Sequence, residues 1–137
     1  MRKFARTRKN SSRRWRRNDP SVLEMKIITG TLKLDELKRM AAERFGDMAK
    51  AVVDVEQGIL AVDAELHSDL EAKLLENGSE QKDLWGINLY PDMAGSDFIE
   101  YDSMINLRPG QGNRTRSVDD AGLRGKIAAI VMKKVAR

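Results

Sequence analysis

The chain contains no cysteine and a single histidine among its 137 residues. Without cysteine it forms neither disulfides nor thiolate metal sites, which excludes zinc fingers and thiol chemistry and makes a cytoplasmic location the simplest expectation. Its longest apolar runs, IAAIVM and GILAV, are far shorter than the roughly 20 residues that span a bilayer. We therefore expect a soluble protein with no membrane partner. No cofactor motif is present, and none is predicted.

Basic residues are distributed very unevenly along the chain. Residues 1–24 hold nine of the 25 lysines and arginines but only two acidic residues, whereas the remaining 113 residues hold 16 basic and 19 acidic residues. Residues 1–24 also lack a helical or alternating apolar period, which predicts disorder. The expected organisation is a disordered basic tail at residues 1–24 and a single domain at residues 25–137.

Three interpretations of the tail stay open. Its arginines can neutralise phosphates while Phe4 and Trp15 stack on bases, as in the basic arms of nucleic-acid-binding proteins. It can instead be an upstream extension of the reading frame, with the protein starting at Met25. The Arg and Ser content also fits a mitochondrial-type targeting segment, although the apolar stretch of a signal peptide is missing.

Apolar periodicity predicts eight elements from residue 25 onward. A capping box of Ser68 and Glu71 marks the start of the second helix, and Ser117 marks the start of the third. The expected strands are 25–29, 50–56, 59–65, 83–91 and 97–108, and the first helix is 34–45. The resulting order, β-α-β-β-α-β-β-α, begins like the split βαβ arrangement of ferredoxin-like domains.

We therefore predict an α+β fold of two layers. A mostly antiparallel five-stranded sheet with a ferredoxin-like split βαβ core would carry its helices on one face. Acidic residues share one face of three predicted strands, which predicts an open acidic face. They are Asp54, Glu56, Asp63, Glu65, Glu100 and Asp102.

Three stretches resemble a known family: FGDMAKAVVDVE, ELHSDLEAKLLENGSEQKDLWGINLYP and FIEYDSMINLRPGQGNRTRSVDD. They are similar to short prokaryotic proteins grouped as a domain of unknown function. The similarity covers residues 25 to 135. It implies no activity, because the family has none to carry over.

His67 is the first candidate for chemistry. It lies two residues after Glu65 at the end of a predicted strand, so it can act as a general acid or base with Glu65 orienting the ring. The alternative is a histidine hydrogen-bonded at a helix entrance. Asp54, Asp63 and Asp102 are oxygen ligands suited to Mg²⁺, but such residues are more often solvated, and no metal site is predicted.

The second candidate is the loop from residue 105 to residue 120, which has two glycines and three arginines. Amides near the coming helix can attract an anion. Arg114 and Arg116, together with Gln111 and Asn113, can bind phosphate or nucleic acid. The plain alternative is a structural crossover in which the two arginines pair with carboxylates of the domain. We predict mainly the latter.

The third candidate is the strand DLWGINLYP. Trp85 and Tyr90 fall on opposite faces of it, and Gly86 allows another group to approach the backbone closely. The pair is a candidate ligand platform or homodimer interface, with core packing as the alternative.

Two functions follow from these candidates. The first is a non-catalytic interaction module, a homodimer that binds a protein or nucleic-acid partner through the open face or the loop. The second is a small phosphodiester-directed hydrolase or nuclease, with His67 and Glu65 as acid and base and Arg114 and Arg116 holding phosphate.

Overall fold

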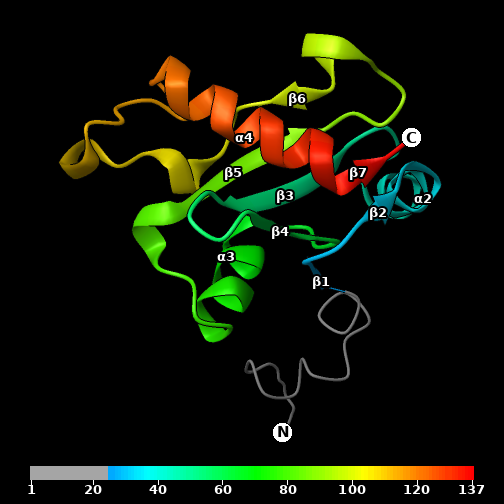
Figure 1. Cartoon of the computed structure of the whole chain (residues 1–137), viewed down its shortest axis with the longest axis horizontal. Coiled ribbons are helices and arrows are strands. Elements are labelled where there is room, and N and C mark those ends of the chain that lie inside the picture. Colours follow the sequence, from blue (N-terminus) through cyan, green and yellow to red (C-terminus); the bar gives the residue numbers. More distant parts are fainter. Residues whose placement is uncertain (1–24) are drawn as a thin grey trace, which may run out of the picture.

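A five-stranded antiparallel sheet forms the middle of the protein (Figure 1). The computed structural model describes residues 25–137, so the predicted disordered tail at residues 1–24 lies outside the described residues. The strands stand in the order β1-β4-β3-β5-β6. Their bounds are Lys26–Ile28 for β1, Ala49–Asp54 for β3, Ile59–Val62 for β4, Leu84–Leu89 for β5 and Ile99–Glu100 for β6. The α+β class and the five-stranded sheet are confirmed.

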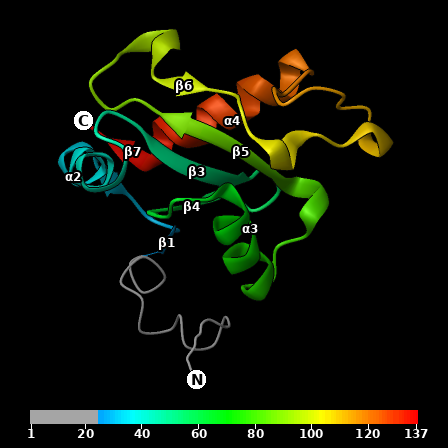
Figure 2. The ribbon, with the colours of Figure 1, turned by 180° about the vertical axis from the view of Figure 1, so that it is seen from behind.

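The helices cover both faces of this sheet rather than one. Helices α2 (Leu34–Arg44) and α4 (Ala121–Lys134) bury Leu37, Met40, Ile127 and Val131 in one core with Val53 and Ile87. Helix α3 (His67–Glu76) buries Leu70 and Leu74 in a second core with Val52 and Leu84. Because Val52 and Val53 alternate across β3, the two cores lie on opposite faces. Helix α4 stands in front of β3 and β5 in Figure 1 and behind them in Figure 2.

The connections between strands explain this arrangement. β1 and β3 run parallel with β4 between them, and β4 and β5 run parallel with β3 between them. The crossover from β1 to β3 contains α2, and the crossover from β4 to β5 contains α3. Both cross the sheet in the same direction, but the strands of the first pair run opposite to those of the second. Two right-handed crossovers therefore place α2 and α3 on opposite faces.

The ferredoxin-like order is not confirmed. The first three strands do form a split βαβ unit, but β5 pairs with β3 instead of joining the far side of β1. β1 has only three residues, whereas β3 pairs with β5 over six residues. The longer partner gives β5 more ladder hydrogen bonds and more cross-strand contacts.

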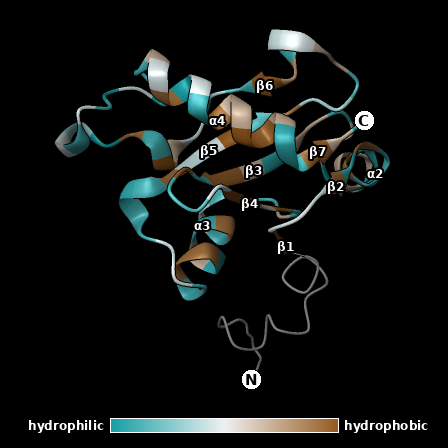
Figure 3. Ribbon diagram, in the orientation of Figure 1, coloured by the Kyte–Doolittle hydropathy of each residue, from teal (hydrophilic) through white to brown (hydrophobic). Residues whose placement is uncertain are grey.

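Helix α3 covers part of the side on which an open acidic face was expected, and two of the six acidic residues of that face are buried. Asp54 and Asp63 are only 1% and 2% exposed. Asp54 accepts hydrogen bonds from the backbone amides of Glu56 and Gln57 and from the hydroxyl of Ser79, so it holds the β3–β4 turn together. Figure 3 shows hydrophobic residues along β3 and hydrophilic ones at the short helix η2 (Gln81–Asp83).

The C-terminal part differs most from the predicted elements. Strand β6 has two residues instead of the expected twelve, and short 3-10 helices follow it at η4 (Met104–Asn106) and η5 (Pro109–Gln111). Helix α4 begins at Ala121, capped by Asp120, and not at Ser117. Helix α3 likewise begins at His67, and the predicted cap of Ser68 is not formed.

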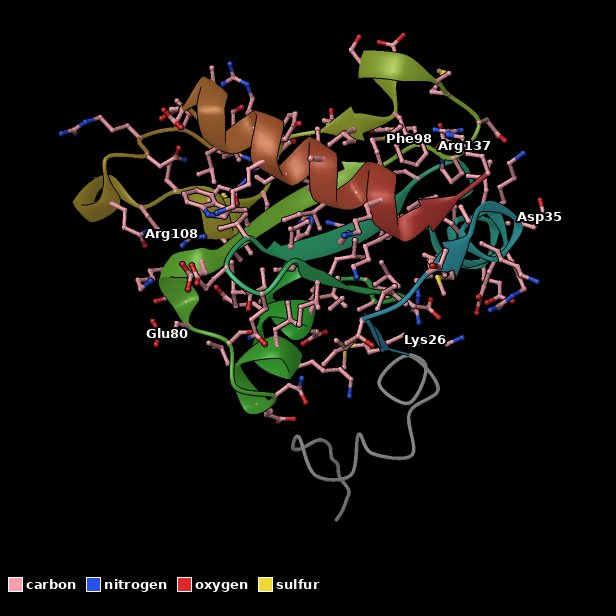
Figure 4. The ribbon with its side chains drawn as sticks, in the orientation of Figure 1. Lys26, Asp35, Glu80, Phe98, Arg108 and Arg137 are labelled. Carbon is pink, nitrogen blue, oxygen red and sulfur yellow. The ribbon has the colours of Figure 1, made fainter. Side chains whose placement is uncertain are left out.

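The end of the chain is tied to the start of α2. β2 (Leu32–Lys33) and β7 (Val135–Ala136) pair in a parallel two-stranded sheet. The guanidinium carbon of Arg137 lies 4.6 Å from the ring centre of Phe98, and Figure 4 shows these two side chains next to each other. Within residues 25–137, no helix combines the length and the apolar character that a bilayer crossing needs.

Candidate functional site

A pocket of about 380 Å³ lies where the first turn of α3 meets β5, β6 and the segment from residue 102 to 105. This volume is in the range of small-molecule sites. Its polar lining comprises Lys50, His67, Ser68, Asn88, Glu100, Asp102, Ser103 and Arg116. Its apolar lining comprises Met48, Leu66, Met104 and Ile105. Polar and charged groups from five segments of the chain thus converge on one hollow.

Three of these polar side chains form a row across neighbouring strands. Lys50 on β3 is paired in register with Asn88 on β5, and Asn88 is paired with Glu100 on β6. Directly paired residues of an antiparallel sheet point to the same face, here the face that α3 covers. The pocket therefore presents a cation, an amide and a carboxylate in that order.

Asn88 has an unsatisfied hydrogen-bonding group. Its Nδ2 donates to Oε1 of Glu100 at 2.9 Å and to the carbonyl oxygen of Asp102 at 3.4 Å. Both partners can only accept, so the amide must keep Nδ2 toward them and Oδ1 away. Oδ1 is buried and has no hydrogen-bond partner within residues 25–137, while the whole residue is 6% exposed. Asn88, a residue of the pocket lining, thus carries a buried acceptor that lacks a donor among the described residues.

Glycine at position 86 brings the neighbouring groups together. A Cβ atom there would lie 2.6 Å from Cβ of Ser103, closer than real Cβ contacts, and 3.2 Å from Cδ2 of His67, which is tighter than most of them. The sequence indicated that Gly86 allows a close approach to the backbone, and Ser103 and His67 are the groups that approach it. The Asn106 side chain accepts from the amide of Gly86 at 2.8 Å and donates to its carbonyl at 2.9 Å, like an adjacent strand.

His67 is buried and hydrogen-bonded to the backbone. Its Nε2 must donate to the carbonyl oxygen of Ile87 at 2.8 Å, which leaves Nδ1 as an acceptor. Burial lowers the pKa of His67 to about 4, because desolvation disfavours the imidazolium. Lys50 and Arg116 contribute to this lowering of the pKa, while the bond to Ile87 and the charge of Asp102 oppose it. The ring is therefore neutral at pH 7.

This shift makes the stability of the protein depend on pH. The folded pKa of about 4 lies below the ordinary histidine pKa of 6.5, which is expected in the unfolded chain. Between the two values the unfolded chain binds more protons, so the free energy of unfolding falls as the pH falls. From pH 7 to pH 5 we expect a loss of about 2 kcal/mol from His67 alone.

Urea denaturation of the wild type and of His67→Gln at both pH values measures this contribution. The wild type should lose about 2 kcal/mol more than the variant. If the two proteins lose the same free energy of unfolding between pH 7 and pH 5, His67 titrates near its ordinary pKa and its burial does not favour the neutral ring.

A family match covers nearly all of the described residues. A family described as "Protein of unknown function (DUF5674)" matches residues 26–134. The chain belongs to this family. The resemblance predicted for residues 25 to 135 is thereby confirmed, while the prokaryotic origin stays a prediction. Neither a curated protein nor a solved structure matches the chain.

The structure brings only some of the predicted site residues to the pocket. In this DUF5674 chain His67 and Arg116 line it together. Glu65 does not reach His67; its exposed carboxylate lies 3.9 Å from Nη1 of Arg44. Tyr90 donates its hydroxyl to Oε1 of Glu100 at 3.0 Å, beside the pocket. Burial raises the pKa of Tyr90, and its bond to Glu100 raises it further.

The two arginines of the loop have different partners. Nε of Arg116 donates to Oδ1 of Asp102 at 2.7 Å, with the arginine side chain 54% exposed. Arg114 is exposed, and in the described residues its side chain forms no hydrogen bond or ion pair. Its backbone amide instead donates to Asp119 at 2.8 Å. The predicted carboxylate contact is therefore present for Arg116 and absent for Arg114.

The loop is held by side chains that the sequence did not single out for this role. The amide of Asn113 is buried; it donates to the carbonyls of Asn106 and Ser117 and accepts from the amide of Asp119. Gln111 donates to the carbonyl of Lys82 at 3.2 Å. These contacts close residues 106–119 into a compact turn, which explains why α4 starts after residue 117.

Arg108 fastens the same loop to the sheet. Its guanidinium donates to the carbonyl oxygens of Ile105, Gln81 and Leu84 and stacks on the Trp85 ring, 4.2 Å from the ring centre. Burial lowers the pKa of Arg108. Figure 4 shows it beside η2 at one end of the sheet. Trp85 is 4% exposed and faces the α4 core, so it lies on the opposite side of β5 from the pocket.

A metal site is not formed in the described part of the chain. No group of three or more His, Asp or Glu side chains within residues 25–137 is placed to hold an ion. Asp54 and Asp63 lie at the ends of different strands and have separate partners.

Proposed function

We propose that the protein is a non-catalytic binding module whose ligand occupies the pocket at the first turn of α3. The observation that carries this proposal is the buried Oδ1 of Asn88, which lacks a donor within the described residues. A buried acceptor without a partner costs about 1–3 kcal/mol. A ligand that supplies an N–H or O–H group to this oxygen offsets that cost, and the neutral Nδ1 of His67 is a second acceptor.

Catalysis is a second candidate, favoured by the position of His67 and Arg116 in one pocket. A phosphodiester-directed hydrolase would use the histidine as base and the arginine to hold phosphate. Three features support binding instead. Glu65 is turned toward Arg44, the pKa of His67 is about 4, and no hydrogen bond joins His67 to Ser103 in the described structure.

The macromolecular partners predicted from the sequence stay predictions. A homodimer, a nucleic-acid partner and a cytoplasmic location rest on the sequence alone. Helix α3 covers part of the side of the sheet that was expected to bind a partner, and the pocket lies on the same side beside β5 and β6. The pocket is therefore the surface that we propose for binding.

Two probes that differ in a single donor test the proposal. N-methylacetamide carries one N–H group, and N,N-dimethylacetamide has none. In a ¹H–¹⁵N NMR titration of the full chain, we expect the first to shift the amide signals of Ile87, Asn88 and Ser103 saturably, and the second to leave them in place. The difference should vanish in Asn88→Leu, which keeps the size of the side chain and removes its acceptor.

The matched probes keep this test decisive even if Asn88→Leu does not fold. Equal shifts from both compounds, or saturable shifts only at other sites, would contradict a binding pocket built around Oδ1 of Asn88. Asn77→Leu, a change of the same kind at an exposed position after α3, is the control and should retain the difference.

A further inference from the structure

We infer that the ligand of this pocket is a free dipeptide, with its carboxylate at Lys50, its peptide N–H at Asn88 and its ammonium group at Glu100. This inference rests on the proposed function and names the class of its ligand. It is carried by the row of Lys50, Asn88 and Glu100 across β3, β5 and β6. The order of these groups is complementary to the order of charges and donors in a dipeptide.

Lys50 supplies the cationic end. It is half-buried in the pocket lining, and within residues 25–137 it has no carboxylate at ion-pair distance. Nζ of Lys50 lies 5.5 Å from the centre of the Phe45 ring. An ammonium group with three donors and no anion beside it is suited to a carboxylate, and the partial burial of the residue strengthens a charge-assisted hydrogen bond.

Glu100 supplies the anionic end. Its Oε1 already accepts from Nδ2 of Asn88 and from the hydroxyl of Tyr90. Oε2 has no donor among the described residues, and the side chain is exposed, so an ammonium group can approach it. Asp102, the other carboxylate of the pocket, is instead paired with Arg116. Glu100, at the end of the row, is thus the carboxylate with an oxygen that can accept a further hydrogen bond.

The spacing of the row suits two residues joined by one peptide bond. Neighbouring strands lie about 4.8 Å apart, so the backbones of Lys50 and Glu100 are about 10 Å apart. Two residues extend about 7 Å, and the flanking side chains reach across the rest. A single amino acid lacks the peptide N–H that Oδ1 of Asn88 requires, and a chain of three residues, about 10 Å long, leaves no space for the side chains.

The apolar lining indicates which side chains such a dipeptide carries. Met48, Leu66, Met104 and Ile105 surround the polar row, and Leu66 and Met104 are exposed at its rim. Methionine is flexible and adapts to differently shaped apolar groups. We therefore expect aliphatic dipeptides to bind with little preference among their side chains.

Four forms of one dipeptide test the inference on the full chain. They are alanyl-alanine, its N-acetyl derivative, its C-terminal amide and the form blocked at both ends, titrated by calorimetry or NMR. Each block should weaken binding about tenfold, because each removes one charge-assisted contact, and tenfold corresponds to about 1.4 kcal/mol. Free alanine should bind more weakly than the unblocked dipeptide.

Two variants assign each contact to its residue. In Lys50→Met the amide and carboxylate forms should bind equally, while the preference for a free ammonium group remains. In Glu100→Gln the N-acetyl form and the form with a free ammonium group should bind equally, while the preference for a free carboxylate remains. Lys38→Met and Glu76→Gln change exposed residues outside the pocket lining and should leave all four affinities unchanged. If a pocket variant does not fold, the four forms still report on both contacts in the wild type.

Other outcomes overturn the inference and separate it from the proposed function. Equal binding of all four forms, or binding of inorganic phosphate more tightly than alanyl-alanine, excludes the dipeptide. If N-methylacetamide occupies the pocket but alanyl-alanine does not, the pocket is a binding site for another class of ligand. If neither binds, the inference and the proposed function both fail.

Discussion

Replacing Arg44 with methionine should lower the free energy of unfolding by about 3 to 5 kcal/mol. Nε of Arg44 donates to Oδ1 of Asp63 at 2.8 Å, and Nη2 donates to the carbonyl oxygen of the same residue at 3.1 Å. The two side chains are 10% and 1% exposed. Methionine fills similar space but leaves the carboxylate of Asp63 buried without its partner charge, which is the costly half of breaking a buried pair.

The backbone of Asp63 adds to this dependence on Arg44. Asp63 has a φ of 76° and is the one non-glycine residue with positive φ in the described part of the chain. Aspartate tolerates this region better than most residues, but the conformation still needs support from its surroundings. The bond from Arg44 to the carbonyl oxygen of Asp63 supplies it, where β4 ends and the chain turns toward α3.

Urea denaturation with a matched control measures the effect. Arg39→Met breaks a pair with Glu43 in which both side chains are about half exposed, so it should cost no more than about 1 kcal/mol. The double variant Arg44→Met with Asp63→Asn should recover part of the loss, because no charge is then left buried. If Arg44→Met costs no more than Arg39→Met, the pair does not hold this corner of the fold.

Alternation and turn residues predicted four of the five strands of the sheet closely, but they did not predict what covers the sheet. The acidic residues at the ends of β3 and β4 share a face, a pattern typical of solvated carboxylates. Asp54 and Asp63 are instead buried, because a serine hydroxyl and an arginine from distant segments satisfy them. Whether a carboxylate is paired depends on tertiary neighbours, and its position in a strand does not reveal them.

The loop before α4 shows the same limit. The sequence indicated that the arginines of this loop could be anion ligands. Asn106 and Asn113 supply the hydrogen bonds that an irregular segment needs when it packs against a sheet. An asparagine in a loop gives no sign of which backbone groups it satisfies, because those groups lie up to 20 residues away. Of the two carboxylate contacts predicted for this crossover, Arg116 forms one with Asp102 and the Arg114 side chain forms none among the described residues, and the asparagines were not predicted to hold the loop.

The pocket could be predicted only in part. His67 and Arg116 were both named as candidates from the sequence, and both line it. Glu65 was paired with His67 because it is near in sequence, but the residues that share the pocket come from strands that are adjacent only in space. The row of Lys50, Asn88 and Glu100 requires the strand order and register, and a single sequence does not contain either in readable form.

Gly86→Ala should destabilise the protein by about 3 kcal/mol and abolish binding in the pocket, because overpacking forces a shift of backbone or side chains. The new Cβ atom would lie 2.6 Å from Cβ and 2.7 Å from Oγ of Ser103. Ser103 is 1% exposed and its amide is bonded to the carbonyl oxygen of Arg116, so it cannot move freely. The other contact, His67, is held by Ile87. Gly86 does not have a positive φ, so the cost is steric.

Two further variants separate this steric effect from the general effect of replacing a glycine. Gly125→Ala in α4 meets no atom within 4 Å, and it should stabilise the protein by up to about 1 kcal/mol through helix propensity. Gly86→Ala combined with Ser103→Gly removes both crowded atoms of the serine and should recover much of the stability. Urea denaturation compares all three proteins. A neutral Gly86→Ala, or a double variant no more stable than the single one, would show that Ser103 and His67 do not depend on the glycine for their positions in the pocket.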